Sequence, residues 1–188
     1  MRFETNPLLV VASSLRDADA GIRKLHITGS CSVYGSIPFE LIPQNELPIT
    51  EDVDIITPVN TIEGWLIDKF GWASEFWDEH HLMIDPVDIN TSILPPGWLG
   101  RMVSLPNDLG MEILCLDIYD ACASKMAASR EKDISFVTIL LNHKLINMSE
   151  LIKRVSLLDD RDFKKYERGI GMKTNKQAIL KRLRSWNY

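Results

Sequence analysis

Two short apolar segments in the first third of the chain constrain its fold more than any other feature. The first, over 25–28, reads Leu-His-Ile-Thr and runs into a turn at Gly29-Ser30. The second, over 53–57, follows Asp52 and contains another acidic residue, Asp54. Both segments predict buried strands, and side chains alternate between the two faces of a strand. Asp52 and Asp54 are therefore expected on one face, with the apolar side chains directed into the core.

Two carboxylates on one face, about 7 Å apart along a strand, repel each other unless a cation lies between them. Oxygen ligands of this kind suit Mg²⁺ or Mn²⁺. A Gly-Ser turn that opens a helix offers backbone N–H groups to a phosphate. A phosphate cradle facing a metal site is the minimum for phosphoryl or nucleotidyl transfer. The alternative is that Asp52 and Asp54 only line a solvated edge strand.

Gly29-Ser30 followed by Asp52-x-Asp54 resembles the signature of the nucleotidyltransferase-fold superfamily. A second stretch, 116–133, is similar to the helical segment that follows the core in AbiEii-like proteins: Leu-Asp, a hydrophobic pair, Asp, a small residue, Lys, then Arg-x-Lys-Asp. The two stretches together cover about 25–141. One departure is the gap of 22 positions between Ser30 and Asp52, about twice the usual length. Three prolines mark this insert: Pro38, Pro43 and Pro48.

The resemblance implies an α/β (α+β) fold with a nucleotidyltransferase-like mixed-sheet core flanked by helices over 1–115. A C-terminal helical lobe with a basic tail would follow over 116–188. Local signals agree with helices in both parts. Asn6 before a proline predicts an N-cap, Asp117 and Ser149 predict two more, and 175–186 predicts a last helix.

The resemblance also implies site residues. Gly29 and Ser30 would contact the triphosphate of a nucleoside triphosphate, and Asp52 and Asp54 would hold the metal. Residues of the helical lobe would reach a phosphate or shape the cleft between the lobes: Lys125 for the phosphate, and Arg130, Lys132 and Asp133 for the cleft. The alternative for these four is an exposed set of ion pairs joining two helices.

Enzymes of this type often carry a third carboxylate on a neighbouring strand. A strand is predicted over 87–89, where Asp88 is flanked by apolar residues. Asp88 is therefore the candidate third metal ligand or catalytic base, with Asp85 second and Glu112 third.

Charge is distributed unevenly along the chain, whose net charge is −5. Residues 1–143 contain nine Lys and Arg against twenty-one Asp and Glu, whereas 144–188 contain twelve against five. A basic tail of this kind suits a polyanion such as tRNA, although a solvated helix face would show the same pattern. The basic candidates are Lys164, Lys165, Lys173, Lys176, Lys181, Arg182 and Arg184.

No apolar run approaches the roughly 20 residues that span a bilayer, and we find no signal peptide. Three cysteines leave an odd number without metal spacing, as expected for buried thiols in a reducing cytoplasm. We therefore expect a cytoplasmic protein with no membrane contact.

The resulting interpretation is a magnesium-dependent nucleotidyltransferase that moves a nucleotide from a nucleoside triphosphate to an RNA, such as tRNA, or to a protein. Several relatives are toxins of toxin–antitoxin systems, which implies a possible antitoxin partner. The first alternative is a catalytically degenerate binding module of the same fold. The second is a metal hydrolase, which would require His80, His81 and Asp85 to converge.

Overall fold

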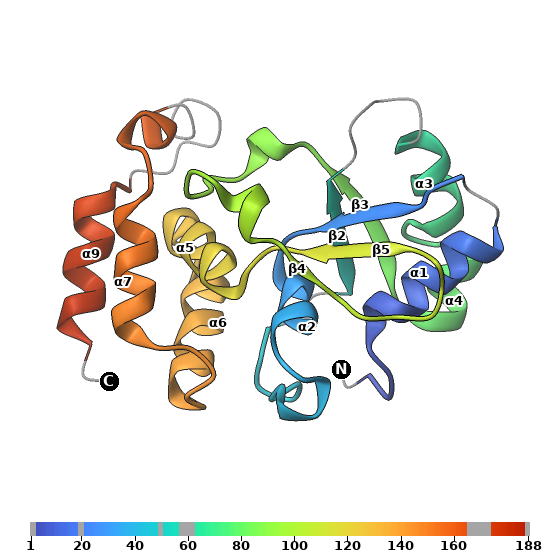
Figure 1. Ribbon diagram of the computed structural model, residues 1–188, viewed down its shortest axis with the longest axis horizontal. Helices are drawn as coiled ribbons and strands as arrows, with labels where there is room; N and C mark the ends of the chain where they lie inside the picture. Colours follow the sequence, from blue (N-terminus) through green and yellow to red (C-terminus); the bar gives the residue numbers. More distant parts are fainter. Residues whose placement is uncertain (1–2, 19–20, 49–50, 57–62, 165–173, 187–188) are drawn as a thin grey trace. The chain divides into compact units, whose positions relative to one another are not determined.

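The computed structural model describes residues 3–18, 21–48, 51–56, 63–164 and 174–186. The chain forms two compact units, which we call the sheet unit and the helical unit. The sheet unit comprises 1–45, 49–89 and 102–117. The helical unit comprises 46–48, 90–101 and 118–188. Figure 1 traces the chain through both units by colour.

The sheet unit is built on a mixed five-stranded sheet in the order β3-β2-β1-β5-β4. Strand β1 runs antiparallel to β2 and parallel to β5, β2 runs parallel to β3, and β4 runs antiparallel to β5. The strands are β1 Lys24–Ile27, β2 Asp52–Ile56, β3 Met83–Val87, β4 Val103–Ser104 and β5 Glu112–Cys115. This arrangement confirms the predicted mixed-sheet fold class. Thr57, the last residue of the second predicted strand, lies outside the described residues.

One face of this sheet forms the core of the unit. The strand registers align alternate residues of four neighbouring strands, so their apolar side chains meet on the same side. All of these side chains are buried: Leu25, Ile27, Val53, Ile55, Ile84, Ile113 and Cys115. The opposite face carries the remaining members of the same alternation, both polar and aliphatic, which are partly or fully exposed.

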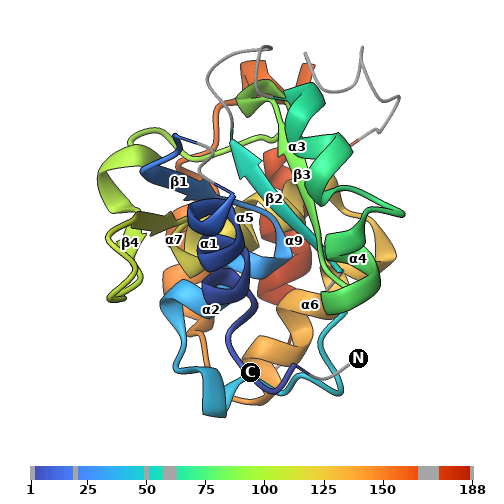
Figure 2. The ribbon, with the colours of Figure 1, turned by 90° about the vertical axis from the view of Figure 1, so that its right-hand side faces the viewer.

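Four helices accompany the sheet: α1 Pro7–Asp17, α2 Val33–Ser36, α3 Glu63–Phe70 and α4 Glu75–His80. Helix α1 begins as predicted, because Asn6 Oδ1 accepts a hydrogen bond from Leu8 N. Helix α2 packs so closely on β5 that a Cβ atom at Gly35 would lie 2.3 Å from Cβ of Cys115. Helices α3 and α4 lie alongside β3 at one edge of the sheet (Figure 1, Figure 2).

The proline-marked insert is a packed loop rather than an extended one. Ile37 and Ile42 are buried, and the Phe39 ring lies 5.8 Å from that of Tyr34. Gln44 Oε1 accepts a hydrogen bond of 2.8 Å from Phe3 N. The insert therefore contributes buried apolar side chains to the protein interior.

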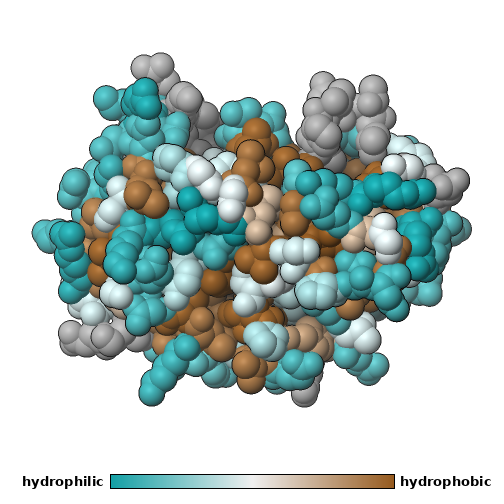
Figure 3. Space-filling view, viewed as in Figure 1, coloured by the Kyte–Doolittle hydropathy of each residue, from teal (hydrophilic) through white to brown (hydrophobic). Residues whose placement is uncertain are grey.

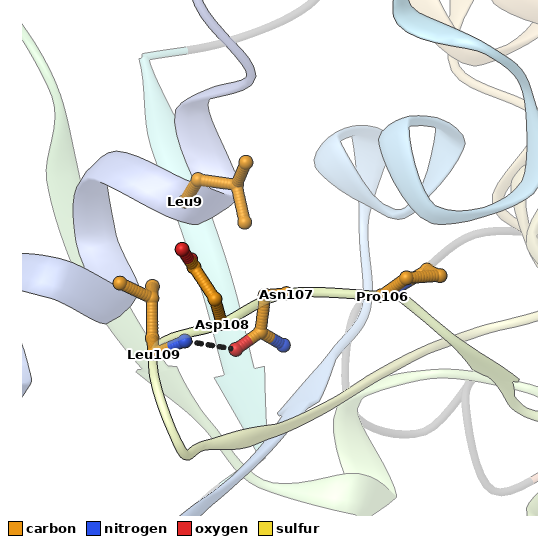
Figure 4. Close-up of a pocket in the computed structure, with 5 residues that line it drawn as sticks. All are labelled: Leu9, Pro106, Asn107, Asp108 and Leu109. Carbon is orange, nitrogen blue, oxygen red and sulfur yellow. Dashed lines mark hydrogen bonds between the residues drawn. The ribbon is translucent and has the colours of Figure 1, made fainter.

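The helical unit contains α5 Ile118–Ala128, α6 Glu131–Asn142, α7 Met148–Ser156 and α9 Lys176–Ser185. Helix α5 packs against α6 and α7, and α7 packs against α9. The predicted cap at Ser149 is wrong: the N-cap is Asn147, whose Oδ1 accepts from the backbone N–H groups of Ser149 and Glu150. Hydrophilic residues gather on the outer side of α9 (Figure 3). None of the described helices combines the length and apolar character needed to cross a bilayer.

Candidate functional site

Three carboxylates share the open face of the sheet. Strand β2 has the predicted alternation, with Asp52 and Asp54 partly exposed and the residues between them buried. In the parallel register of β2 and β3, Asp54 lies directly beside Asp85. Neighbouring strands are about 4.8 Å apart, so these two carboxylates leave adjacent backbone positions on the same side. The face therefore concentrates negative charge at one end of the β2–β3 pair.

The electrostatics of Asp85 reflect this crowding. The pKa of Asp85 is raised, first because surrounding protein atoms remove water from its carboxyl group and second because of the negative charge of Asp52. Like charges that share a site disfavour ionisation, and a cation relieves the repulsion. The repulsion from Asp52 is the second cause of the raised pKa, after desolvation, and it is the part that a bound cation would relieve.

The backbone of Gly29 packs directly against the carboxylate of Asp54 on this face. Gly29 has φ of +63°, in the region that favours glycine, and a Cβ atom there would lie 1.6 Å from Asp54 Oδ2. A side chain at this position would therefore collide with the carboxylate. The turn needs glycine for its conformation and also for its contact with Asp54.

Hydrogen bonds hold the turn on β2. Thr28 N donates to the backbone oxygen of Asp54 at 2.9 Å, and Cys31 Sγ donates to that of Asp52 at 3.4 Å. Ser32 Oγ donates to the Gly29 oxygen at 2.8 Å. The buried Ser30 begins a short 3₁₀ helix, η1 Ser30–Ser32, which leads into α2. The long insert therefore leaves the turn directly against the acidic strand.

The structure does not place Asp88 or Glu112 beside Asp54. The strand predicted over 87–89 does lie beside β2, but it begins earlier, at Met83, and ends at Val87. Asp88 therefore follows β3, about 10 Å along the chain from Asp85. Glu112 opens β5, and its Oε2 lies 3.1 Å from Nζ of Lys24. Lys24 is the first residue of β1, whereas Gly29 follows the last residue of that strand. Glu112, which pairs with Lys24, therefore lies at the end of the sheet that is far from the Gly29 turn.

The carboxylates of this face are donors that suit a divalent metal. Within the described ranges, no three His, Cys, Asp or Glu side chains form a group that could hold a metal ion by themselves. Mg²⁺, however, is usually held by one or two carboxylates and completes its shell with water and substrate phosphates. Asp52 and Asp54 supply hard oxygen donors of that kind, so this face fits Mg²⁺ or Mn²⁺ that shares its coordination with a phosphate.

The histidine pair does not gather with Asp85. His80 ends α4, and its ring lies 4.8 Å from that of Phe76. His81 adopts a left-handed conformation with φ of 50°, and its ring lies edge-on to Trp77 at 6.1 Å. The two rings pack on different aromatic partners, which gives the hydrolase alternative no support in the part of the chain that is described.

In the helical unit, three of the four candidate residues form one ion cluster. Asp133 is fully buried, and its carboxylate accepts from Arg130 Nε at 2.6 Å and from Lys125 Nζ at 3.4 Å. Lys125 Nζ also lies 4.6 Å from the centroid of the Phe136 ring. Lys132 is exposed on α6. Lys125 and Arg130 therefore engage a buried carboxylate that belongs to the packing of α5 and α6.

A second buried carboxylate, Asp120, was not anticipated from the sequence. Arg101 donates to it through Nε at 2.9 Å and Nη2 at 3.1 Å, and Arg154 donates through Nη1 at 2.6 Å. These arginines lie 19 and 34 positions from Asp120 in the sequence, so no local sequence pattern predicts the cluster. Asp120 thereby joins α5 to α7 and to the segment that ends at Arg101.

Residues 13–176 match a family described as "Nucleotidyltransferase of unknown function (DUF6036)". The matched range includes the Gly29 turn, the carboxylates of β2 and β3, and the ion cluster of α5 and α6. No curated protein and no solved structure matches the chain.

Proposed function

Because the chain belongs to the nucleotidyltransferase family of unknown function DUF6036, we propose that it transfers a nucleotidyl group from a nucleoside triphosphate to an acceptor hydroxyl, with release of pyrophosphate. The observation that carries this proposal is the glycine turn packed on Asp54, which itself lies beside Asp85. It supports the proposal because a glycine turn that leads into a helix suits a phosphate, and the neighbouring carboxylates suit a cation.

The residues of the sheet unit take separate roles in the proposal. The turn at Gly29 and Ser30 binds the triphosphate, and Asp52 and Asp54 hold Mg²⁺ or Mn²⁺. When bound, the metal neutralises the triphosphate and lowers the pKa of the acceptor hydroxyl. Asp85 replaces Asp88 as the third carboxylate, because the register puts it beside Asp54.

An RNA acceptor such as a tRNA end is the finer proposal. Its support is the exposed basic surface of α9, which carries Lys181, Arg182 and Arg184. On the same helix, Lys176 Nζ forms an ion pair with Asp160 Oδ2 at 3.5 Å and donates a hydrogen bond to the backbone oxygen of Leu158 at 2.8 Å. Phosphate contacts by the exposed residues predict RNA affinity that falls steeply with salt. Lys165 and Lys173, two other basic candidates, lie outside the described residues.

Membership of the AbiEii-like branch, with a toxin role and an antitoxin partner, extends the proposal further. Its support is the similarity of 116–133 to the helical segment of that branch. A protein hydroxyl as acceptor is compatible with the same core chemistry.

The proposal is tested by incubating the protein with total tRNA, Mg²⁺ and each labelled nucleoside triphosphate in turn. We expect label to move onto RNA or onto protein, and the transfer to be lost in Asp52→Asn and Asp54→Asn. Glu112→Gln is the matched control, since it neutralises a carboxylate at the other end of the sheet and should retain transfer.

The second candidate function is a binding module of the same fold without turnover. The observation that favours it is the gap of 22 positions between Ser30 and Asp52, about twice the usual length of the motif. Metal-dependent binding of a nucleoside triphosphate with no transfer to RNA or protein would support this function and overturn the transferase. Equal transfer by the wild type and both β2 variants would overturn the assigned site.

A further inference from the structure

The open face of the sheet continues past the carboxylates in an ordered row of side chains. Because Ile27 pairs with Ile55 in the antiparallel β1–β2 ladder, Thr28 lies opposite Asp54 and His26 lies opposite Ile56. The parallel ladders then place Leu114 on one side of His26 and Val87 beyond Ile56. Across β5, β1, β2 and β3, the row next to Asp54 therefore reads Leu114, His26, Ile56 and Val87, which we call the His26 row. Ser104 of the edge strand β4 pairs with Leu114 outside this row.

The His26 row has the surface chemistry of a flat apolar platform with one polar group. All four of its side chains are partly exposed, unlike the buried residues of the opposite face. Three are aliphatic and one is an imidazole in a central strand of the sheet. Among the described residues, no side chain or backbone group forms a hydrogen bond with the His26 ring. The imidazole thus keeps its donor and its acceptor available.

Charge around the row argues against a phosphate ligand there. The pKa of His26 is lowered, first by burial and second by the positive charge of Lys24, although the negative charge of Glu112 opposes the change. The imidazole is therefore neutral at pH 7 and gives no cationic attraction to a phosphate. An uncharged ring between aliphatic side chains suits a planar group with polar edges.

Building on the proposed function, we propose that the His26 row binds the base of the donor nucleotide and that His26 is the residue that discriminates between bases. Diagonal neighbours in an antiparallel pair are about 7–8 Å apart, so His26 lies one such step from Asp54. A triphosphate held at the Gly29 turn and the carboxylates would have its base one sugar away, on the neighbouring row. The aliphatic side chains pack on the base, and the imidazole contacts its polar edge.

The test compares the binding of ATP, GTP, CTP and UTP with that of inorganic tripolyphosphate, all with Mg²⁺, by calorimetry. Loss of a base contact is worth about 1–3 kcal/mol, so we expect His26→Ala to weaken the preferred nucleotide roughly 5- to 150-fold. Tripolyphosphate has no base, and its affinity should be unchanged. Lys24→Arg, on the same face of β1 but one row further, keeps the positive charge near His26. It is the control and should bind both probes as the wild type does.

A second variant keeps the platform while removing its polar edge. His26→Leu preserves apolar packing, so we expect it to bind nucleotides with reduced preference between the four bases. Thermal unfolding of each variant establishes that the sheet remains folded.

The outcomes separate this inference from the function on which it rests. If the wild type binds nucleotides and His26→Ala binds them equally well, only the role of the His26 row is overturned. The same conclusion follows if the variant loses affinity for tripolyphosphate in parallel with its affinity for nucleotides. If the wild type binds no nucleotide, the proposed function fails together with this inference.

Discussion

Gly29 and Asp54 are in direct contact: a Cβ atom on residue 29 would lie 1.6 Å from Oδ2 and 2.6 Å from Cγ of Asp54. The positive φ of Gly29 adds a second, independent requirement for glycine. Gly110 also has a positive φ, +70°, but nothing lies within 4 Å of its would-be Cβ atom, so it serves as a control for positive φ without a contact.

Gly29→Ala should therefore destabilise the protein more than Gly110→Ala. Each substitution puts a side chain at a positive φ, which costs about 1–3 kcal/mol, and Gly29 with ψ of −153° lies in a region that is essentially restricted to glycine. Only Gly29→Ala adds overpacking against Asp54, of about 1–3 kcal/mol. The free energy of unfolding in urea measures both. The double variant Gly29→Ala, Asp54→Ala should recover part of the added cost, since it removes the colliding carboxylate. Equal destabilisation by the two glycine variants would contradict the contact.

Asp120 should be among the residues most sensitive to substitution. It is fully buried between Arg101 and Arg154, so Asp120→Ala leaves two partly buried guanidinium groups uncompensated. We expect a loss of about 3–5 kcal/mol in the free energy of unfolding. Lys153→Ala is the control, because it breaks an exposed pair with Glu150 and should cost less than about 1 kcal/mol. Similar losses for the two variants would show that the buried cluster is not structural.

Lys125→Met distinguishes a structural lysine from one that serves only a ligand. The substitution removes the 3.4 Å contact with Asp133 and the cation–π contact with Phe136, while Arg130 still binds the carboxylate. We expect a loss of about 1–3 kcal/mol in urea unfolding. Lys132→Met alters an exposed side chain and should change stability by less than about 0.5 kcal/mol. An unchanged unfolding free energy in Lys125→Met would leave only the phosphate role that the resemblance implies.

Local patterns made one part of the candidate site predictable. The alternation of β2 depends only on the sequence from Asp52 to Ile56, and a period of two residues fixes which side chains share a face. The turn at Gly29 was likewise visible, because glycine and serine after an apolar strand are typical of tight turns. Its contact with Asp54 was not, since an insert of unknown path separates them.

Long-range pairing made the rest unpredictable. The place of Asp85 beside Asp54 depends on the β2–β3 register, which is set by packing across the whole crossover between the strands. Pro86 also made β3 hard to predict, because proline is unfavourable in a central strand. It is tolerated here because β3 lies at the edge of the sheet. The apolar run from Leu82 to Ile84 before Asp85 was the available signal. No sequence signal pointed to the cluster of Asp120 with its two arginines, because the three residues come from separate segments of the chain.

Cys115 gives a prediction about pH. Burial raises the pKa of its thiol to about 12, from an unfolded value near 9.0. Between these values the unfolded chain has released a proton that the folded chain retains, so ionisation favours unfolding and stability falls as pH rises. The loss should approach about 1.4 kcal/mol for each pH unit above 9. Urea unfolding of the wild type and of Cys115→Ala from pH 8 to 10 isolates this effect, because lysines and tyrosines titrate in both proteins. We expect the stability advantage of the wild type to shrink as pH rises; parallel pH profiles would show that the thiol is not kept protonated by the fold.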